Sequence, residues 1–323
     1  MHVRFWGVRG SCPSPLRSED IVTRLQEALL HLGRDSAAPD LRDREAVTRW
    51  VDQLPLAVRG TSGGNTPCVE MRTDAGDLFI IDLGSGLRPL GTALMETEFG
   101  LGEGHANIFL SHFHWDHIQG WPFFKPVYLA GNRFDVYTRH DNLEQRLHAQ
   151  QEAPFFPAAS WDDMHAAIAY HQMNDEPMLL CDGRVRVTTI ELDHPSRAWA
   201  YRFEADGKIF VYASDSAYHH LDKSSTKPFV DFYRDADLLI FDAQFTLAES
   251  FEKRTWGHSS AIVGVELACQ AGVKNLALFH HDPGADEEML ENLLRVGEDY
   301  AEAVRCPEHC RLTLAREGLT IDL

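Results

Sequence analysis

The stretch Ser111-His112-Phe113-His114-Trp115-Asp116-His117 places three imidazoles and a carboxylate within six positions, directly after a predicted strand over residues 105–110. Residues two apart in extended backbone point to the same side, so His112 and His114 can reach one ion. Asp116 and His117 fall where the chain is expected to turn into a helix, and there they can face a second ion. Zinc, manganese and iron all accept nitrogen and carboxylate oxygen as ligands.

Further ligand candidates lie elsewhere in the sequence, each at the end of a predicted strand. Any one of them alone could be a core or turn residue, but their common position favours one shared site. His281 stays open as an alternative to His280, although the offset from the preceding strand favours His280. The three candidates are His194 after Leu192-Asp193, Asp215 after Phe210-Val211-Tyr212-Ala213-Ser214, and His280 after Leu276-Ala277-Leu278-Phe279.

The pattern along the chain predicts an α/β fold in a single domain over residues 1–323. Strand patterns, hairpins included, alternate with helical patterns, so we expect two mixed β-sheets covered by helices. Apolar residues three and four apart predict a helical insertion at about 17–57. Residues from about 121 to 180 include the proline-aromatic stretch Ala153-Pro154-Phe155-Phe156-Pro157, and we expect a lid or rim there.

The amino-acid composition limits the kinds of molecule that the protein is expected to bind. The formal net charge is −19, and no cluster of five or more Lys and Arg occurs, which disfavours a long nucleic acid. A small anionic substrate held by metal ions is compatible with this charge, because the ions dominate the local field. No apolar run reaches the roughly 18 residues of a membrane span. The N-terminus also lacks a signal-peptide layout. We therefore expect a cytoplasmic protein with no membrane partner.

The six cysteines are scattered through the chain, which is typical of a reducing compartment. Cys306-Pro307-Glu308-His309-Cys310 is similar to a metal motif, but a structural zinc site needs further ligands at compatible spacing, and none lies nearby in the sequence. Ordinary surface or core cysteines are the favoured interpretation.

The order of these residues resembles the metallo-β-lactamase superfamily, and most closely its phosphodiesterase branch. That branch includes ribonuclease Z and the cyclic-phosphate and cyclic-nucleotide phosphodiesterases. The resemblance covers nearly the whole chain except the predicted helical insertion, and it implies an αββα sandwich. It rests on HFHWDH at 112–117, His194, Ala213-Ser214-Asp215, Gly257-His258-Ser259 and His280, with FWGVRGS at 5–11, GGNT at 63–66 and IDLGSG at 81–86.

The resemblance also implies roles for these residues in a site with two divalent metal ions, zinc first, with manganese or iron as alternatives. Asp82 would orient a ligand imidazole from behind. Asp116 would help to orient the nucleophile, and His258 would donate a proton to the leaving group. The alternative for His258 is a residue that merely precedes a helix capped by Ser259 or Ser260. The implied ligands are His112, His114 and His194 for one ion, Asp116, His117 and His280 for the other, and Asp215 for both.

The function expected from this resemblance is hydrolysis of a phosphodiester bond by a water activated between two metal ions. The substrate would be small, with a cyclic nucleotide or related cyclic phosphate as the first candidate. The alternatives are a tRNA- or RNA-processing nuclease, a thioesterase or lactonase, and an inactive binding or sensor module. An inactive module should lack a ligand, whereas all seven positions are filled here. The resemblance makes a homodimer plausible.

Overall fold

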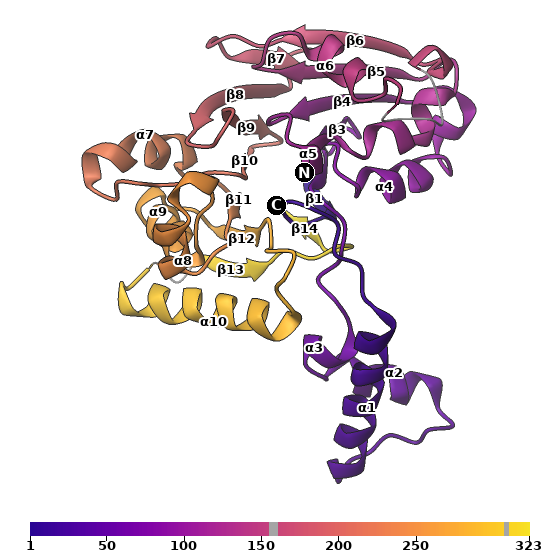
Figure 1. The fold of residues 1–323 in the computed structure, drawn as a ribbon, viewed down its shortest axis with the longest axis vertical. Coiled ribbons are helices and arrows are strands. Elements are labelled where there is room, and N and C mark those ends of the chain that lie inside the picture. The colour runs from indigo at the N-terminus through magenta and orange to yellow at the C-terminus, as the bar shows by residue number, and fades with distance from the viewer. Residues whose placement is uncertain (155–160, 307–309) are drawn as a thin grey trace.

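The computed structural model describes residues 1–154, 161–306 and 310–323 and contains two seven-stranded sheets (Figure 1). In spatial order, the first sheet consists of β14 (Thr320–Asp322), β1 (His2–Gly7), β2 (Cys68–Arg72), β3 (Leu78–Ile81), β4 (His105–Leu110), β5 (Arg133–Thr138) and β6 (Ala167–Gln172). The second sheet consists of β13 (Arg311–Leu314), β12 (Asn275–Phe279), β11 (Leu238–Asp242), β10 (Lys208–Ala213), β9 (Ala198–Ala205), β8 (Val185–Leu192) and β7 (Met178–Leu180).

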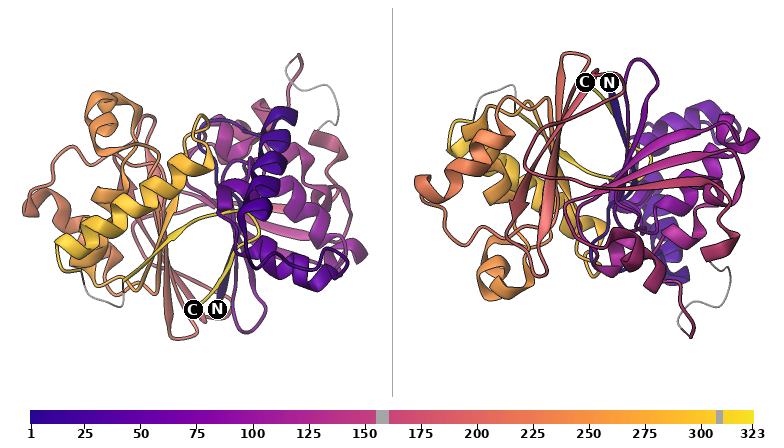
Figure 2. Two further views of the ribbon diagram at one scale, coloured as in Figure 1. Left: turned by 90° about the horizontal axis from the view of Figure 1, so that it is seen from below. Right: turned by 90° about the horizontal axis from the view of Figure 1, so that it is seen from above.

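The sheets pack face to face, with helices on their outer sides (Figure 2). Side chains of both sheets meet in a central core that includes Phe79, Phe109 and Phe203. A second core joins the first sheet to α4 (Leu87–Leu94) and α6 (Leu143–Ala149). A third joins the second sheet to its helices, and the predicted αββα sandwich of two mixed sheets is confirmed. These helices are α7 (Lys223–Tyr233), α8 (Leu247–Glu252), α9 (Ala261–Ala271) and α10 (Glu287–Ala303).

Strand direction explains why residues far apart in the sequence converge. The run β3 to β6 is parallel, and so is the run β10 to β13. Strand β8 points the same way as β10, because β9 is antiparallel to both. The carboxyl ends of these strands therefore share one edge in each sheet, where the short helix α5 (Trp115–Ile118) follows β4.

Residues 18–59 form a helical arm of three helices that projects from the sandwich (Figure 1): α1 (Ser18–Arg34), α2 (Arg44–Asp52) and α3 (Leu56–Arg59). Neither α1 nor α2 contains a buried residue. The arm meets the body at the buried Glu287 of α10, which forms an ion pair with Arg24 and accepts hydrogen bonds from Thr61 Oγ1 at 2.9 Å and Ser62 N at 3.1 Å. Leu56 of α3 also packs against the core of the second sheet and donates through its backbone N to Glu291 Oε1 at 3.1 Å, so carboxylates of α10 hold the base of the arm together with this apolar contact.

The structure differs from the lid or rim expected over residues 121–180. Much of this segment belongs to the sandwich itself: β5, β6, α6 and β7 lie within it. Phe134 and Val136 of β5 are buried in the core, so the short apolar runs of this segment are strand patterns. The stretch Phe155-Phe156-Pro157 lies outside the described residues.

Short 3₁₀ turns complete the described elements, at Glu98–Leu101, Trp121–Phe123, Lys125–Tyr128, Trp161–Asp163 and Arg254–Trp256. Among the residues that the structure describes, no helix combines the length and apolar character that a membrane crossing requires.

The cysteines depart from the sequence-based expectation, because Cys269 and Cys306 form a disulfide with a Cα–Cα distance of 5.3 Å. The interpretation as ordinary surface or core cysteines, typical of a reducing compartment, was therefore wrong for this pair. Cys269 lies in α9 and Cys306 follows α10, and these two helices pack against each other. Packing brings together two cysteines separated by 37 positions in the sequence.

Candidate metal centre

The first group of ligand candidates consists of three histidines from two strand ends. Ligand nitrogens of His112, His114 and His194 all lie within 4.8 Å of one another, with His194 Nε2 3.0 Å from His114 Nδ1. His194 uses its other ring nitrogen, Nδ1, to donate to the Gly257 carbonyl at 2.8 Å, which leaves Nε2 facing the other imidazoles. His112 Nε2 is buried and has no hydrogen-bond partner among the described residues, as expected of an atom that binds a metal ion.

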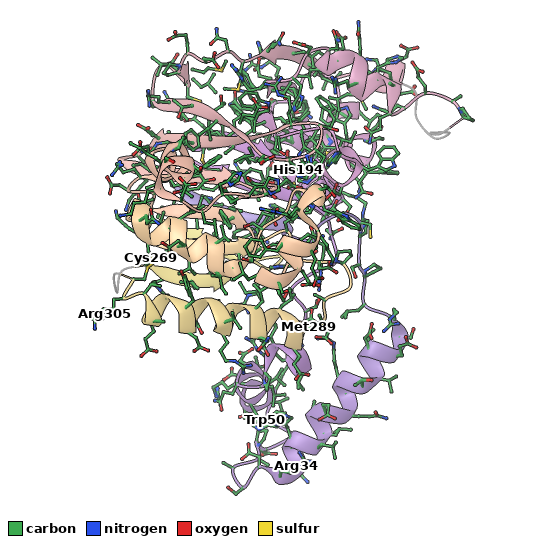
Figure 3. The ribbon with its side chains drawn as sticks, turned by 60° about the vertical axis from the view of Figure 1, so that its left-hand side comes forward. Arg34, Trp50, His194, Cys269, Met289 and Arg305 are labelled. Carbon is green, nitrogen blue, oxygen red and sulfur yellow. A yellow bond between two sulfur atoms is a disulfide. The ribbon has the colours of Figure 1, made fainter. Side chains whose placement is uncertain are left out.

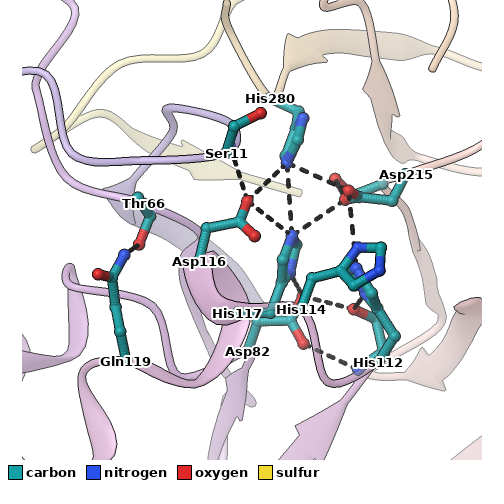
Figure 4. A network of polar contacts seen from close by, with 12 residues as sticks. Ser11, Thr66, Asp82, His112, His114, Asp116, His117, Gln119, Asp215 and His280 are labelled. Atoms are coloured by element: carbon teal, nitrogen blue, oxygen red, sulfur yellow. Dashed lines mark hydrogen bonds and ion pairs between the residues drawn. The ribbon is translucent and has the colours of Figure 1, made fainter. Parts of the chain in front are cut away.

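The second group lies beside the first and contains a carboxylate (Figure 4). Asp116 Oδ2 is 3.3 Å from His117 Nε2 and 3.2 Å from His280 Nε2. Asp215 lies between the groups: its Oδ1 is 3.8 Å from both His112 Nε2 and His194 Nε2, and its Oδ2 is 3.2 Å from His117 Nε2. One carboxylate thus faces both groups of nitrogens.

Asp82 lies behind His117, as the resemblance implies. Its Oδ2 accepts a hydrogen bond from His117 Nδ1 at 2.7 Å and another from Tyr212 Oη at 2.7 Å. Ser111 donates through its backbone N to Oδ1 and through its hydroxyl to Oδ2, both at 2.8 Å. With Nδ1 of His117 engaged, Nε2 is the nitrogen that faces the site, and the orientation of the imidazole is fixed.

His258 lies against the same cluster, with its ring 4.9 Å from that of His280 and 5.2 Å from that of His194. Its Nδ1 is 2.8 Å from Asp242 Oδ2 at the end of β11. Burial lowers the pKa of His258, but the carboxylates of Asp242 and, more weakly, Asp215 outweigh burial and raise it overall. His258 is therefore a buried imidazole whose protonated form is favoured by Asp242 beside the ligand candidates. The cap of α9 is Ser260, whose hydroxyl accepts from Val263 N.

The electrostatics of the two groups differ. Burial, together with the neighbouring imidazoles, lowers the pKa of His112 well below its ordinary value, so this imidazole is neutral and presents a lone pair. Burial also disfavours the charged form of His117, yet Asp215, Asp116 and Asp82 raise its pKa well above the usual value. The carboxylates thus favour positive charge between them, which a divalent cation supplies more strongly than a proton.

Three of these residues adopt a left-handed backbone conformation, which residues other than glycine rarely adopt. Asp82, Asp215 and His280 have φ values of 61°, 62° and 59°. The left-handed region is sterically costly for residues with a Cβ. In all three cases the residue follows the last residue of a strand or the one after it, so the turn aims the side chain at the centre. Such outliers cluster at functional sites, where the surrounding structure holds them.

The structure brings every predicted site residue to one edge of the sandwich. His281, the alternative to His280, lies outside the cluster and donates through Nε2 to the Ala315 carbonyl. The sequence analysis missed two residues that support the site. Asp242 ends a buried strand, the same signal that located Asp215. Gln244 accepts a hydrogen bond from His280 Nδ1 at 2.9 Å, and no sequence signal marks it.

Comparison with known proteins agrees with this geometry. The family model described as the β-lactamase superfamily domain matches residues 101–281. The chain is 28% identical over 229 residues to the probable metallo-hydrolase YhfI of Bacillus subtilis (strain 168), with 70% of this chain and 86% of YhfI covered. It is 25% identical over 280 residues to ribonuclease Z of Halobacterium salinarum, again with coverage of 70% and 86%.

Solved structures show the same fold. The crystal structure of YhfI superimposes with a TM-score of 0.61 and 17% identity, covering 99% of this chain and 98% of YhfI. A diphosphatase from the PhnP family superimposes with a TM-score of 0.60 and 19% identity, covering 100% of this chain and 97% of that one. At these identities, the likeness is evidence of fold alone.

Proposed function

This chain is a hydrolase of the metallo-β-lactamase superfamily, and we propose that it cleaves a phosphodiester bond in a small substrate. A cyclic nucleotide or related cyclic phosphate is the first candidate. The observation that carries the proposal is the buried imidazole of His258, held by Asp242 at 2.8 Å, beside ligand candidates for two cations. A proton donor is needed where the leaving group is a poor one, such as the alkoxide of a ribose.

The donor set fits two divalent ions, with zinc as the first candidate because histidine and carboxylate are its usual ligands. When bound, two such ions would lower the pKa of water and neutralise the charge that develops at phosphorus. Asp215 would contact both ions, since its two oxygens face both groups of nitrogens. The remaining ligands would be His112, His114 and His194 for one ion, and Asp116, His117 and His280 for the other.

The residues around the ions have separate tasks in this proposal. Asp116 Oδ2 accepts a hydrogen bond from Ser11 N at 2.7 Å, which fixes the carboxylate that would orient the attacking water. His258 would transfer its proton to the leaving oxygen, and Asp242 would stabilise the imidazolium until that step. His258 is only 8% exposed, so bulk water competes little for its proton.

The relatives support a second candidate, an RNA-processing nuclease, because the likeness to ribonuclease Z spans 86% of that enzyme. Charge favours the small substrate, since a net charge of −19 repels a polyanion. The helical arm carries acidic and basic residues together and contains no run of basic residues, which disfavours it as an element that binds RNA.

The test is hydrolysis of bis-p-nitrophenyl phosphate and of 3′,5′- and 2′,3′-cyclic nucleotides by metal-loaded protein, with a precursor tRNA, a thioester and a lactone assayed in parallel. We expect turnover of a cyclic nucleotide that Asp215→Ala abolishes. The matched control is His105→Ala, which removes an exposed histidine paired with Asp135 away from the cluster. Turnover of the thioester or lactone without any phosphodiester would refute the proposal, and turnover of tRNA alone would establish the nuclease.

A further inference from the structure

Three cysteines gather at the end of the second sheet that carries β13, away from the candidate metal centre. Cys269 lies in the last turns of α9, Cys306 follows α10, and Cys310 directly precedes β13. Their sulfur atoms all lie within 4.8 Å of one another. Figure 3 labels Cys269 and His194 in different parts of the molecule, so this group of sulfurs is separate from the histidine cluster.

The sequence alone offered only two of these cysteines as a group and no further ligand near them. The packing of α10 on α9 supplies the third, Cys269, from 37 positions upstream of Cys306. His309, the other candidate in the motif, lies outside the described residues. Cys269 thus supplies the further ligand that the sequence does not place near this motif.

We propose that Cys269, Cys306 and Cys310 form a thiolate site for a soft divalent cation, with zinc as the first candidate, when the disulfide is reduced. Tetrahedral zinc holds thiolates at about 2.3 Å, which places sulfurs about 3.8 Å apart. The three sulfurs already lie within 4.8 Å of one another, which is close to that spacing. The Cα atoms of Cys269 and Cys306, 5.3 Å apart, already let both sulfurs reach one point.

Reduction must come first, because two of the sulfurs are joined to each other. A dithiol reductant transfers two electrons and two protons to the Cys269–Cys306 disulfide and is itself oxidised to its disulfide. The cation then displaces the protons of the three thiols and binds three thiolates. All three cysteines are partly exposed, so the cation can enter from solvent, and solvent completes the fourth position.

Such a site would tie together three elements, of which the disulfide joins only two. The cation would link α9, the end of α10 and the start of β13, the outermost strand of the second sheet. Oxidation would replace this three-way link with a single bond between Cys269 and Cys306, leaving Cys310 unattached.

Cobalt binding tests the proposal independently of activity. Thiolate ligands give Co²⁺ a near-ultraviolet charge-transfer band that nitrogen and oxygen ligands do not give, so the histidine cluster contributes nothing to this signal. The full chain, reduced and titrated with Co²⁺, is expected to show the band and to lose it on oxidation. Zinc should displace the cobalt, and zinc should raise the melting temperature of the reduced chain further than that of Cys310→Ser.

Two variants and a control make the result decisive. Cys310→Ser keeps the disulfide pair and is expected to remove the band and one bound cation per chain, and Cys306→Ser should do the same. The control is Cys181→Ser, which changes a partly exposed cysteine elsewhere and should keep both the band and the bound cation. A reduced wild-type chain without the band, or a Cys310→Ser chain that retains it, overturns the proposal.

Discussion

The candidate metal centre and the helical arm are opposite extremes of packing in one chain. In the centre, charged and polar side chains such as His112, His117 and Asp215 are almost fully buried and constrain one another. In the arm, apolar side chains such as Leu25 and Leu29 are 61% and 66% exposed. A buried polar group is stable only while its hydrogen-bond and ionic partners are present, whereas an exposed apolar side chain contributes little to the free energy of unfolding. Substitutions in the two regions should therefore have very different effects.

The largest effect is expected at Asp215, the carboxylate between the two ligand groups. Asp215→Ala should lower phosphodiester hydrolysis by roughly 10³-fold or more, because several kcal/mol of charge stabilisation depend on the ions. Metal analysis should show fewer bound ions per chain than in the wild type. Chelation of the wild-type protein should cause the same loss of hydrolysis. Added zinc should restore hydrolysis in the chelated wild type but not in Asp215→Ala. Full activity in Asp215→Ala would disprove the bridging role.

His258→Ala should slow hydrolysis of a cyclic nucleotide by about 10²- to 10⁴-fold, the usual contribution of a proton donor. Hydrolysis of bis-p-nitrophenyl phosphate should fall much less, because p-nitrophenolate leaves without a proton. Metal content should be unchanged. Steady-state rates with both substrates check this prediction, and an equal loss with both would show that His258 is not the donor.

Glu287 is the buried residue on which the arm depends. Glu287→Ala should lower the free energy of unfolding by roughly 3 kcal/mol, because Arg24 and Arg9 lose a buried partner. We expect proteases to cleave within residues 18–62 faster than in the wild type. The matched control is Glu288→Ala, on the same turn of α10 but not paired with Arg24. Similar cleavage rates in the two variants would contradict the anchoring role.

The same residue predicts a pH dependence. Burial raises the pKa of Glu287, but hydrogen bonds from Ser62 and Thr61 and the charge of Arg24 outweigh it and lower the pKa overall. Its contribution to stability is therefore present above the ordinary glutamate pKa of about 4.3 and lost as the pH falls through the lower folded value. Unfolding titrations from neutral to acidic pH should show this loss in the wild type and not in Glu287→Gln.

A smaller effect is expected from Asp242→Asn. The carboxylate stabilises protonated His258, so its neutralisation lowers the pKa of that imidazole. A proton donor must be protonated to work, and the alkaline limb of the pH–rate profile should therefore move to lower pH. At neutral pH the rate should fall roughly tenfold. A profile that coincides with that of the wild type would exclude this role.

The smallest effect is expected in the arm. Leu25→Ser and Leu29→Ser should change the free energy of unfolding by about 0.5 kcal/mol or less and leave metal content and turnover unchanged. Leu239→Ala, in the buried strand β11, is the contrasting variant and should cost about 2 to 5 kcal/mol. Chemical denaturation of the three variants checks the contrast. A large loss from either arm variant would show that this surface is covered in solution.

The same contrast separates what the sequence could predict from what it could not. Alternation after a strand brings His112 and His114 together, and the strand-end position finds Asp215 and His280, because local geometry controls where such side chains point. The rule also applied to Asp242, which was overlooked. The pairing of Cys269 with Cys306 depends on how α9 and α10 pack, and nothing local encodes that. The strands within residues 121–180 were not predicted, because their short apolar runs stand beside a proline-aromatic stretch and were interpreted with it as a lid or rim.

The left-handed backbone at Asp82, Asp215 and His280 has a consequence for any attempt to make this protein more heat-resistant. Glycine at any of the three would relieve about 1 to 2 kcal/mol of strain. Glycine would at the same time remove a buried hydrogen-bond partner, as Asp82 is for His117, Tyr212 and Ser111, so the relief of strain is offset by donors left without an acceptor. These positions should be held constant during thermostabilisation, and an accepted glycine there would indicate that selection for activity had lapsed.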